Sequence, residues 1–269
     1  MATLRENDRR RQISVISAFA FMIIGDLVGL GAFGGTPIQD AVGGALSPEA
    51  SYLTPATGAF SIWSVIYLGL FGYTVWQALP GQRSRERQRA LGWWIALTMV
   101  LNGAWLVTVQ FAGVWATVVM LAVLLAALCA TYVRAMQTRP DKGSAADAAL
   151  IDGTTGLHLG WAALATVANI GAALTATGPS SWASAADVLG VLVVAVVAGL
   201  VLALAAWSRW RLAPGIAVGW GLSWLAVSRL SGDLGSVPIG VAAIAAAVVV
   251  VAVPVVMRGR AALATRAAA

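Results

Sequence analysis

Aromatic side chains recur at helical spacing in the stretch from 55 to 73, PATGAFSIWSVIYLGLFGY. Phe60, Trp63, Tyr67 and Phe71 stand at offsets of three, seven and eleven residues, which keeps them on one side of an α-helix. Flat aromatic faces stack on other planar apolar groups. Because lipid does not require an aromatic stripe on one helix face, we expect this row to face inward, towards another helix or a cavity.

Two further apolar stretches combine tryptophan with polar side chains at helical spacing. Asn102 and Trp105 are three residues apart, and His158, Trp161 and Asn169 share a second face. Ligand sites are mostly apolar with a few placed polar groups. We therefore expect an outward-opening site for a flat hydrophobic molecule, lined by Phe60, Trp63, Tyr67, Asn102, Trp105, His158, Trp161, Ala165 and Asn169. Tight aromatic packing without any cavity is the alternative interpretation.

Asp26 is the ionisable residue that stands deepest in the first apolar stretch, between Gly25 and Gly29. A carboxylate inside a membrane is costly, so function is the default interpretation. A hydrogen-bonded Asp that only ties helices together is an equal alternative. Intramembrane ionisable residues often relay protons, which makes a proton-coupled transporter that uses Asp26, Asp152 and His158 the second functional hypothesis. Asp152 falls at the start of its helix, where a solvated carboxylate is the simpler interpretation.

Enzymatic chemistry finds little support in the sequence. We find no nucleophile–base pair, no metal-binding cluster and no phosphate loop, so an enzyme that modifies a porphyrin is the least favoured class. Cys129 is the only cysteine, which excludes a disulfide within the chain and a cysteine-based metal site. Lys142 is the only lysine and falls in a predicted loop, where it cannot form the intramembrane Schiff base of a retinal photoreceptor.

Composition places all these residues in membrane helices. The chain has 269 residues, of which 59% are apolar and 10% charged, whereas soluble domains carry about 25% charged residues. Apolar runs of roughly 20 residues, long enough to cross a bilayer as a helix, recur along the chain. The sequence predicts an all-α integral membrane protein, a bundle of about eight transmembrane helices near 13–33, 56–79, 91–110, 114–136, 150–174, 185–207, 213–230 and 236–257.

The net charge of +6 could suggest a nucleic-acid partner, but the distribution of the basic residues argues against one. Of the 17 Lys and Arg residues, only Arg229 falls outside if the N-terminus is cytoplasmic. This is the positive-inside bias that sets membrane orientation. We expect both termini in the cytoplasm, with lipid rather than nucleic acid around the chain. The frequent Ala, Val, Gly and Arg suggest a bacterial cytoplasmic membrane.

Three short motifs occur in order on the predicted second, third and fifth helices: F-x-x-W-x-x-x-Y from Phe60, N-x-x-W from Asn102 and W-x-x-x-A-x-x-x-N from Trp161. Together they resemble the signatures of the TspO/MBR family, the translocator or tryptophan-rich sensory proteins. The resemblance covers roughly residues 13–174, the five-helix unit of that family. It implies a TspO-like unit over residues 1–178 and an additional three-helix block with a cytoplasmic tail over residues 179–269.

The resemblance implies a receptor, sensor or transporter for a tetrapyrrole such as protoporphyrin IX or haem, or for a sterol-like molecule. The sequence departs from the family pattern at Leu157-His158, where the family has Pro-Tyr, and at Ser61-Ile62, where it usually has Pro-Val. The first departure affects ligand preference, because it places the only histidine on the predicted pocket face. His158 could ligate haem iron, although a buried histidine is more often a hydrogen-bonded core residue. No cofactor is firmly implied, and glycine-rich helix faces allow a homodimer.

Overall fold

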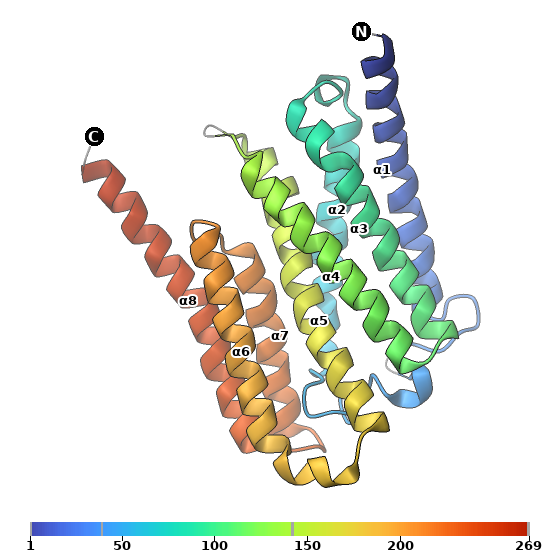
Figure 1. The fold of residues 1–269 in the computed structure, drawn as a ribbon, viewed down its shortest axis with the longest axis vertical. Helices are drawn as coiled ribbons and strands as arrows, with labels where there is room; N and C mark the ends of the chain where they lie inside the picture. The colour runs from blue at the N-terminus through green and yellow to red at the C-terminus, as the bar shows by residue number, and fades with distance from the viewer. Residues whose placement is uncertain (1, 39, 141–142, 268–269) are drawn as a thin grey trace. The chain divides into compact units, whose positions relative to one another are not determined.

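The computed structural model describes residues 2–38, 40–140 and 143–267, and Figure 1 shows the chain as a ribbon. Within these ranges the chain forms eight long α-helices, short 3₁₀ turns and one π-helix, with no β-strand, which confirms the predicted all-α bundle. The long helices are α1 (Ala2–Gly29), α2 (Ile62–Ala78), α3 (Glu86–Phe111), α4 (Val114–Gln137), α5 (Thr154–Thr177), α6 (Ala186–Trp207), α7 (Ala213–Ser231) and α8 (Val237–Ala267).

The apolar composition explains why these segments are helical. In a bilayer every backbone N–H and C=O must be paired within the protein, and an α-helix achieves this within one segment. Among the described residues, seven helical segments are long and apolar enough to cross a membrane. The chain is therefore an integral membrane protein. Helix α7 is not among the seven because Gly, Ser and Trp make up much of its sequence.

The ends of several helices differ from the predicted spans. Helix α1 begins at Ala2, well before residue 13, and α8 continues to Ala267. The N-terminal extension is charged, and the Glu6 carboxylate pairs with the Arg10 guanidinium at 2.5 Å, one turn later on the same face. Hydropathy finds only the apolar part of such a helix, so it places the boundary too late. A 3₁₀ turn, Thr57–Ser61, also replaces the expected first turn of α2.

The chain divides into two compact units. Unit 1 consists of Met1–Gly43 and Trp63–Thr155 and contains α1 to α4. Helix α1 lies along α3, where two glycines face each other. A Cβ added to Gly25 would lie 2.7 Å from both the Cα and the carbonyl oxygen of Gly103. The absence of side chains at this crossing lets the two backbones approach, as in other small-residue helix contacts.

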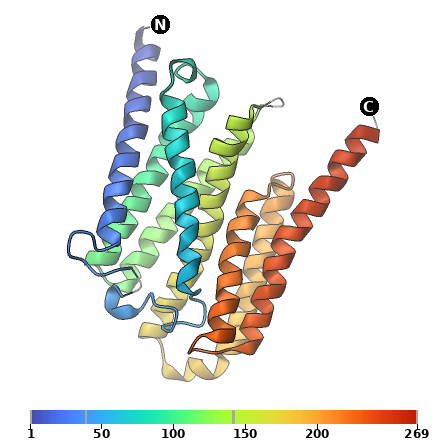
Figure 2. The same cartoon turned by 180° about the vertical axis from the view of Figure 1, so that it is seen from behind.

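Unit 2 consists of Gly44–Ile62 and Gly156–Ala269 and contains most of α5 together with α6 to α8. Figures 1 and 2 show α6, α7 and α8 side by side, running alternately in opposite directions. Glycines again mark the close approaches. A Cβ on Gly215 of α7 would lie 2.5 Å from the carbonyl oxygen of Val250 in α8, and one on Gly160 of α5 would lie 2.4 Å from that of Pro214.

The two units divide the chain differently from the boundary predicted at residue 178. Compactness groups α5 with the three helices that follow it, whereas the family resemblance groups α5 with the helices before it. The close approach of Gly160 to the start of α7 explains the grouping by packing. The functional division at 178 is a separate claim and stays a prediction.

Candidate functional site

Unit 1 contains a chain of polar side chains inside its apolar helices. The Nδ2 of Asn102, on α3, donates a hydrogen bond of 3.1 Å to the hydroxyl oxygen of Tyr67 on α2. The carboxylate of Asp26 on α1 interacts electrostatically with the Tyr67 hydroxyl. Asn102 is fully buried, and Asp26 and Tyr67 are half-buried. The three residues that the sequence singled out separately therefore join three helices of unit 1.

Two tryptophans accompany this polar chain. The Trp63 ring lies 5.2 Å from the Tyr67 ring, centroid to centroid, one turn earlier on α2. Trp105 follows Asn102 by one turn on α3 and is 3% exposed. Among the described residues, the Oδ1 of Asn102 and the Nε1 of Trp105 are buried without a hydrogen-bond partner. A buried acceptor and a buried donor thus remain unused one helical turn apart.

The other predicted site residues belong to unit 2. The Phe60 ring meets the Trp161 ring edge to face, with centroids 6.0 Å apart. His158 and Trp161 are 1% and 2% exposed, so both are core residues of the described structure. The Nδ2 of Asn169 donates to the carbonyl oxygen of Ala165 at 3.0 Å, which gives these two motif positions a local role within α5.

The aromatic row on 55–73 does not form one inward face, contrary to expectation. Phe60 lies in the 3₁₀ turn before α2, so α-helical offsets do not apply to it. Phe71 is 51% exposed and contacts Phe19 of α1 on the outer side of unit 1, with ring centroids 5.8 Å apart. Only Trp63 and Tyr67 of the row pair with each other on the half-buried side of α2.

Residues 44–61 form a segment, here the 44–61 segment, that packs against α5 and α7 within unit 2. The Nε1 of Trp220 donates to the carbonyl oxygen of Ala59 at 3.0 Å. One turn later, the carbonyl oxygen of Trp224 accepts the backbone N–H of Ala56 at 3.1 Å. Trp220 and Trp224 stand four residues apart on one face of α7, and the 44–61 segment is their partner.

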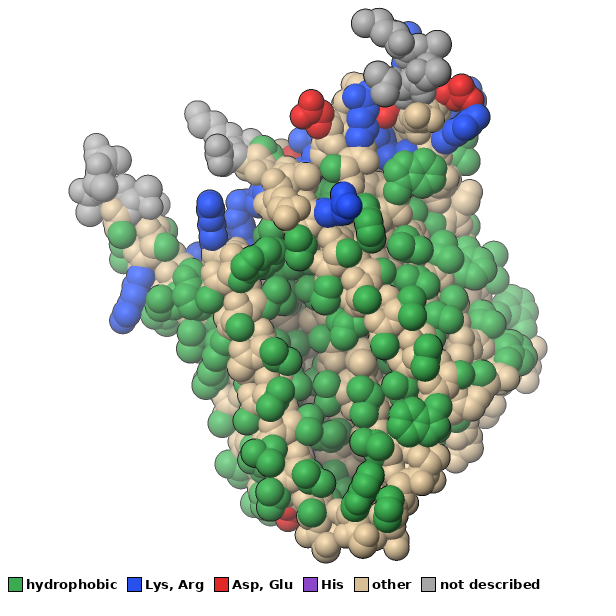
Figure 3. Space-filling model, viewed as in Figure 1, with side chains coloured by type: hydrophobic (Ala, Val, Ile, Leu, Met, Phe, Trp, Pro, Cys, Tyr) green, Lys and Arg blue, Asp and Glu red, His purple; other side chains and the backbone are tan. Residues whose placement is uncertain are grey.

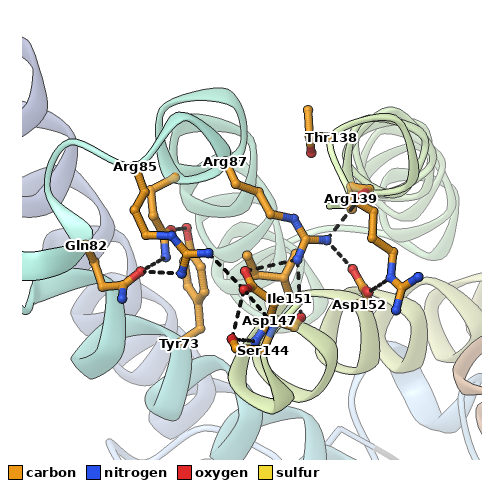
Figure 4. Close-up of polar contacts among 12 residues, drawn as sticks. Tyr73, Gln82, Arg85, Arg87, Thr138, Arg139, Ser144, Asp147, Ile151 and Asp152 are labelled. Atoms are coloured by element: carbon orange, nitrogen blue, oxygen red, sulfur yellow. Dashed lines mark hydrogen bonds and ion pairs between the residues drawn. The ribbon is translucent and has the colours of Figure 1, made fainter. Parts of the chain in front are cut away.

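A buried network of charges forms the other polar centre of unit 1, shown in Figure 4. Arg87, at the start of α3, pairs with both Asp147 and Asp152, and its guanidinium and both carboxylates are at most 6% exposed. Arg85 reaches Asp147 at 2.9 Å and Arg139 reaches Asp152 at 2.7 Å. Asp152 is therefore not the solvated helix start that the sequence suggested.

The π-helix Asp147–Gly153 explains how one arginine holds both carboxylates. In an α-helix two residues five positions apart point in directions about 140° apart. The i→i+5 hydrogen bonding of a π-helix brings such residues closer to one side. The pairing of Asp147 and Asp152 with one guanidinium follows from this wider turn. The five-residue spacing of Asp147 and Asp152 was the only sequence signal of this shared pairing. It indicates a pairing only once the π-helix is known.

The surface of the molecule fits a membrane. Figure 3 shows apolar side chains over the exposed sides of the helices and Lys and Arg side chains gathered near helix ends. Two arginines stack on aromatic rings at such ends. The Arg134 guanidinium carbon lies 4.6 Å from the centre of the Trp94 ring, and that of Arg85 lies 5.5 Å from the Trp76 ring. These two tryptophans therefore serve boundary contacts rather than a ligand site.

Comparison with known proteins identifies the family. The family model described as TSPO-like protein matches residues 12–256. The chain belongs to this family. No curated protein and no solved structure matches it. The match includes α6, α7 and most of α8, so the TSPO-like region extends beyond residues 13–174, whose motifs suggested it. In this TSPO-like protein the polar chain of unit 1 and the aromatic core of unit 2 both lie inside the matched region.

Proposed function

We propose that this TSPO-like protein is a membrane receptor, sensor or transporter that binds a flat hydrophobic molecule, with a tetrapyrrole as the favoured ligand. Family membership supports a role at the membrane. The ligand itself is inferred from the site chemistry, which combines aromatic faces with few polar groups, as ligand sites generally do.

The observation that carries the proposal is the unused pair on α3. Asn102 Oδ1 and Trp105 Nε1 are buried without a partner in the described part of the chain. A buried polar group without a hydrogen bond costs about 1–3 kcal/mol. A ligand that offers one donor and one acceptor along its edge removes both costs. The nearby Trp63 and Tyr67 rings supply the apolar contact that a planar molecule requires.

Porphyrins fit this chemistry better than sterols do. A porphyrin carries carboxyl groups at its edge, which accept hydrogen bonds when ionised and donate when protonated, together with an extended flat face, whereas a sterol has one hydroxyl and no aromatic face. Titration of the purified protein with protoporphyrin IX, haem and a sterol tests whether tetrapyrroles bind more tightly than sterols. Tryptophan fluorescence reports the binding. We expect saturable quenching with the tetrapyrroles. Saturable binding of the sterol alone would contradict the proposed ligand class.

Haem offers a separate test of His158. If His158 ligates the iron, His158→Ala shifts the Soret band of the haem-loaded protein, while the affinity for metal-free porphyrin changes little. An unchanged spectrum in this variant would restrict His158 to packing or hydrogen bonding.

Proton-coupled transport is the second candidate, favoured by the polar cluster of Asn102, Tyr67 and Asp26, in which Asn102 donates to Tyr67 and Asp26 acts on Tyr67 electrostatically. A carboxylate inside a membrane helix bundle is a typical component of proton pathways. Uptake of a tetrapyrrole into proteoliposomes, measured with and without a pH gradient, tests this. Gradient-driven uptake that is lost in Asp26→Asn would support transport, and gradient-independent binding in both proteins would support a receptor.

A further inference from the structure

Arg229 occupies an unusual position in unit 2. It is the one basic residue predicted to lie outside, in the last turn of α7, and it is only 1% exposed. An arginine near a helix end typically pairs with a nearby carboxylate, such as Asp233 four residues later, or extends its side chain towards the headgroups. Neither arrangement occurs, because the Arg229 side chain is buried beneath the 44–61 segment.

The contacts of Arg229 satisfy only part of its guanidinium. Its Nη2 donates to the carbonyl oxygen of Pro48 at 2.7 Å and to the hydroxyl oxygen of Ser228 at 2.6 Å. The guanidinium carbon lies 5.7 Å from the centre of the Tyr52 ring. Among the described residues, Nε and Nη1 are buried and without a hydrogen-bond partner.

The charge of Arg229 also lacks an anion. None of the ion pairs within 4.0 Å in the described residues involves this guanidinium. Glu49, in the 44–61 segment, is the acidic residue that acts on it electrostatically, and Glu49 is exposed. A buried charge without a partner costs several kcal/mol. Arginine presents planar N–H donors that match a carboxylate, so a carboxylate is the natural occupant.

We propose that Arg229 binds a carboxylate of the hydrophobic ligand at the end of α7, beneath the 44–61 segment. This inference rests on the proposed function and narrows it: the ligand is an acid, such as a porphyrin with free propionate groups, rather than a neutral sterol or ester. Nε and Nη1 donate to the carboxylate, while Nη2 keeps its bonds to Pro48 and Ser228.

The same chemistry could come from a lipid phosphate, so the test must separate the two sources. Arg229 lies under protein rather than at an open surface, which favours the acidic group of a ligand that enters the protein. Protoporphyrin IX and its dimethyl ester share the macrocycle and differ in the two carboxylates. They are the matched probes for full-length protein in phosphatidylcholine nanodiscs.

We expect the wild-type protein to bind the acid about tenfold to a hundredfold more tightly than the ester, the range of a hydrogen-bonded charge. Arg229→Gln should lower the acid affinity to that of the ester and leave the ester affinity unchanged. Arg229→Lys should retain part of the preference, and Glu49→Gln should retain all of it. Arg229→Gln removes a buried group and therefore risks misfolding. If that variant does not fold, the preference for acid over ester in the wild-type protein and in Arg229→Lys still tests the site.

Several results would overturn the inference. Equal binding of acid and ester by the wild-type protein would refute the Arg229 site while the proposed function stands, and failure to bind either would refute the proposed function as well. Loss of the preference in Glu49→Gln would identify Glu49 as the element that recognises the ligand instead. If added phosphatidylglycerol weakens acid binding in the wild type but not in Arg229→Gln, the site holds lipid phosphate.

Discussion

The amide of Asn102 donates a 3.1 Å hydrogen bond to the hydroxyl of Tyr67 and thereby joins α3 to α2 inside the apolar part of unit 1. Asn102 is completely buried, so its amide has no access to water. Membrane-buried asparagines bond across helices because lipid offers no partner. The same bond orients the remaining oxygen of Asn102, the acceptor on which the proposed ligand site depends.

Removal of the Tyr67 hydroxyl should therefore affect both stability and binding. Tyr67→Phe leaves the Asn102 amide without its hydrogen-bond partner, and we expect a loss of about 1–2 kcal/mol in the free energy of unfolding. Ser231→Ala is the control, because this exposed hydroxyl bonds only the carbonyl of Val227 in its own helix. Denaturant unfolding in micelles measures both, and equal effects would contradict a structural role for the Tyr67–Asn102 bond.

Loss of Arg87 should be among the most destabilising single changes. Arg87→Met leaves the buried carboxylates of Asp147 and Asp152 without their common partner, and we expect a loss of about 3–5 kcal/mol. Arg10→Met removes an exposed pair with Glu6 and should stay within about 0.5 kcal/mol of wild type. Adding Asp147→Asn and Asp152→Asn to Arg87→Met should restore part of the stability. No restoration would mean that uncompensated charge is not the cause of the loss.

The glycine contact between α1 and α3 predicts a steric effect. Gly25→Ala places a methyl group 2.7 Å from the Gly103 backbone, which forces the helices apart at a cost of about 1–3 kcal/mol. Gly199→Ala in α6 is the matched control, because a Cβ there meets nothing within 4 Å. Its higher helix propensity should raise stability by up to about 1 kcal/mol. A thermal midpoint unchanged in Gly25→Ala would show that the close approach is not maintained.

Membrane topology depends on whether α7 crosses. The charge distribution predicts that it does, with both termini in the cytoplasm. Reporter fusions after Arg211 and Arg258 should give cytoplasmic signals, and fusions after Ser47 and Asp233 external ones. A cytoplasmic signal after Asp233 together with an external one after Arg258 would show that α7 does not cross.

Hydropathy predicted the helices of this fold, since apolar runs of membrane length leave few alternatives to a helix. It could not predict the full length of α1, whose first turns are charged and pair along the helix. The π-helix was equally hidden. The wider turn lets Asp147 and Asp152 share Arg87, which lies 60 residues before Asp147 in the chain, and no local sequence pattern records that pairing.

The candidate site was predictable only in part. Helical spacing identified Asn102 and Trp105 as neighbours and Asp26 as a residue in need of a partner, but the bond to Tyr67 depends on how three helices pack. Spacing also treated Phe60 and Phe71 as members of one row. The 3₁₀ turn and the contact with Phe19 separate them from it. The local sequence around Arg229 indicates a membrane-boundary residue. Its burial could not be predicted, because the 44–61 segment that covers it is distant in sequence.

The affinity of tryptophan variants for protoporphyrin IX tests the central claim, a planar ligand held by interior aromatic residues, most directly. Trp63→Ala and Trp105→Ala, both in unit 1, should each weaken binding about twofold to tenfold, the range expected for an aromatic contact. Trp93→Ala and Trp207→Ala remove side chains that are 49% and 52% exposed, and should leave the dissociation constant nearly unchanged. Equal losses at the interior and the exposed positions would contradict the account.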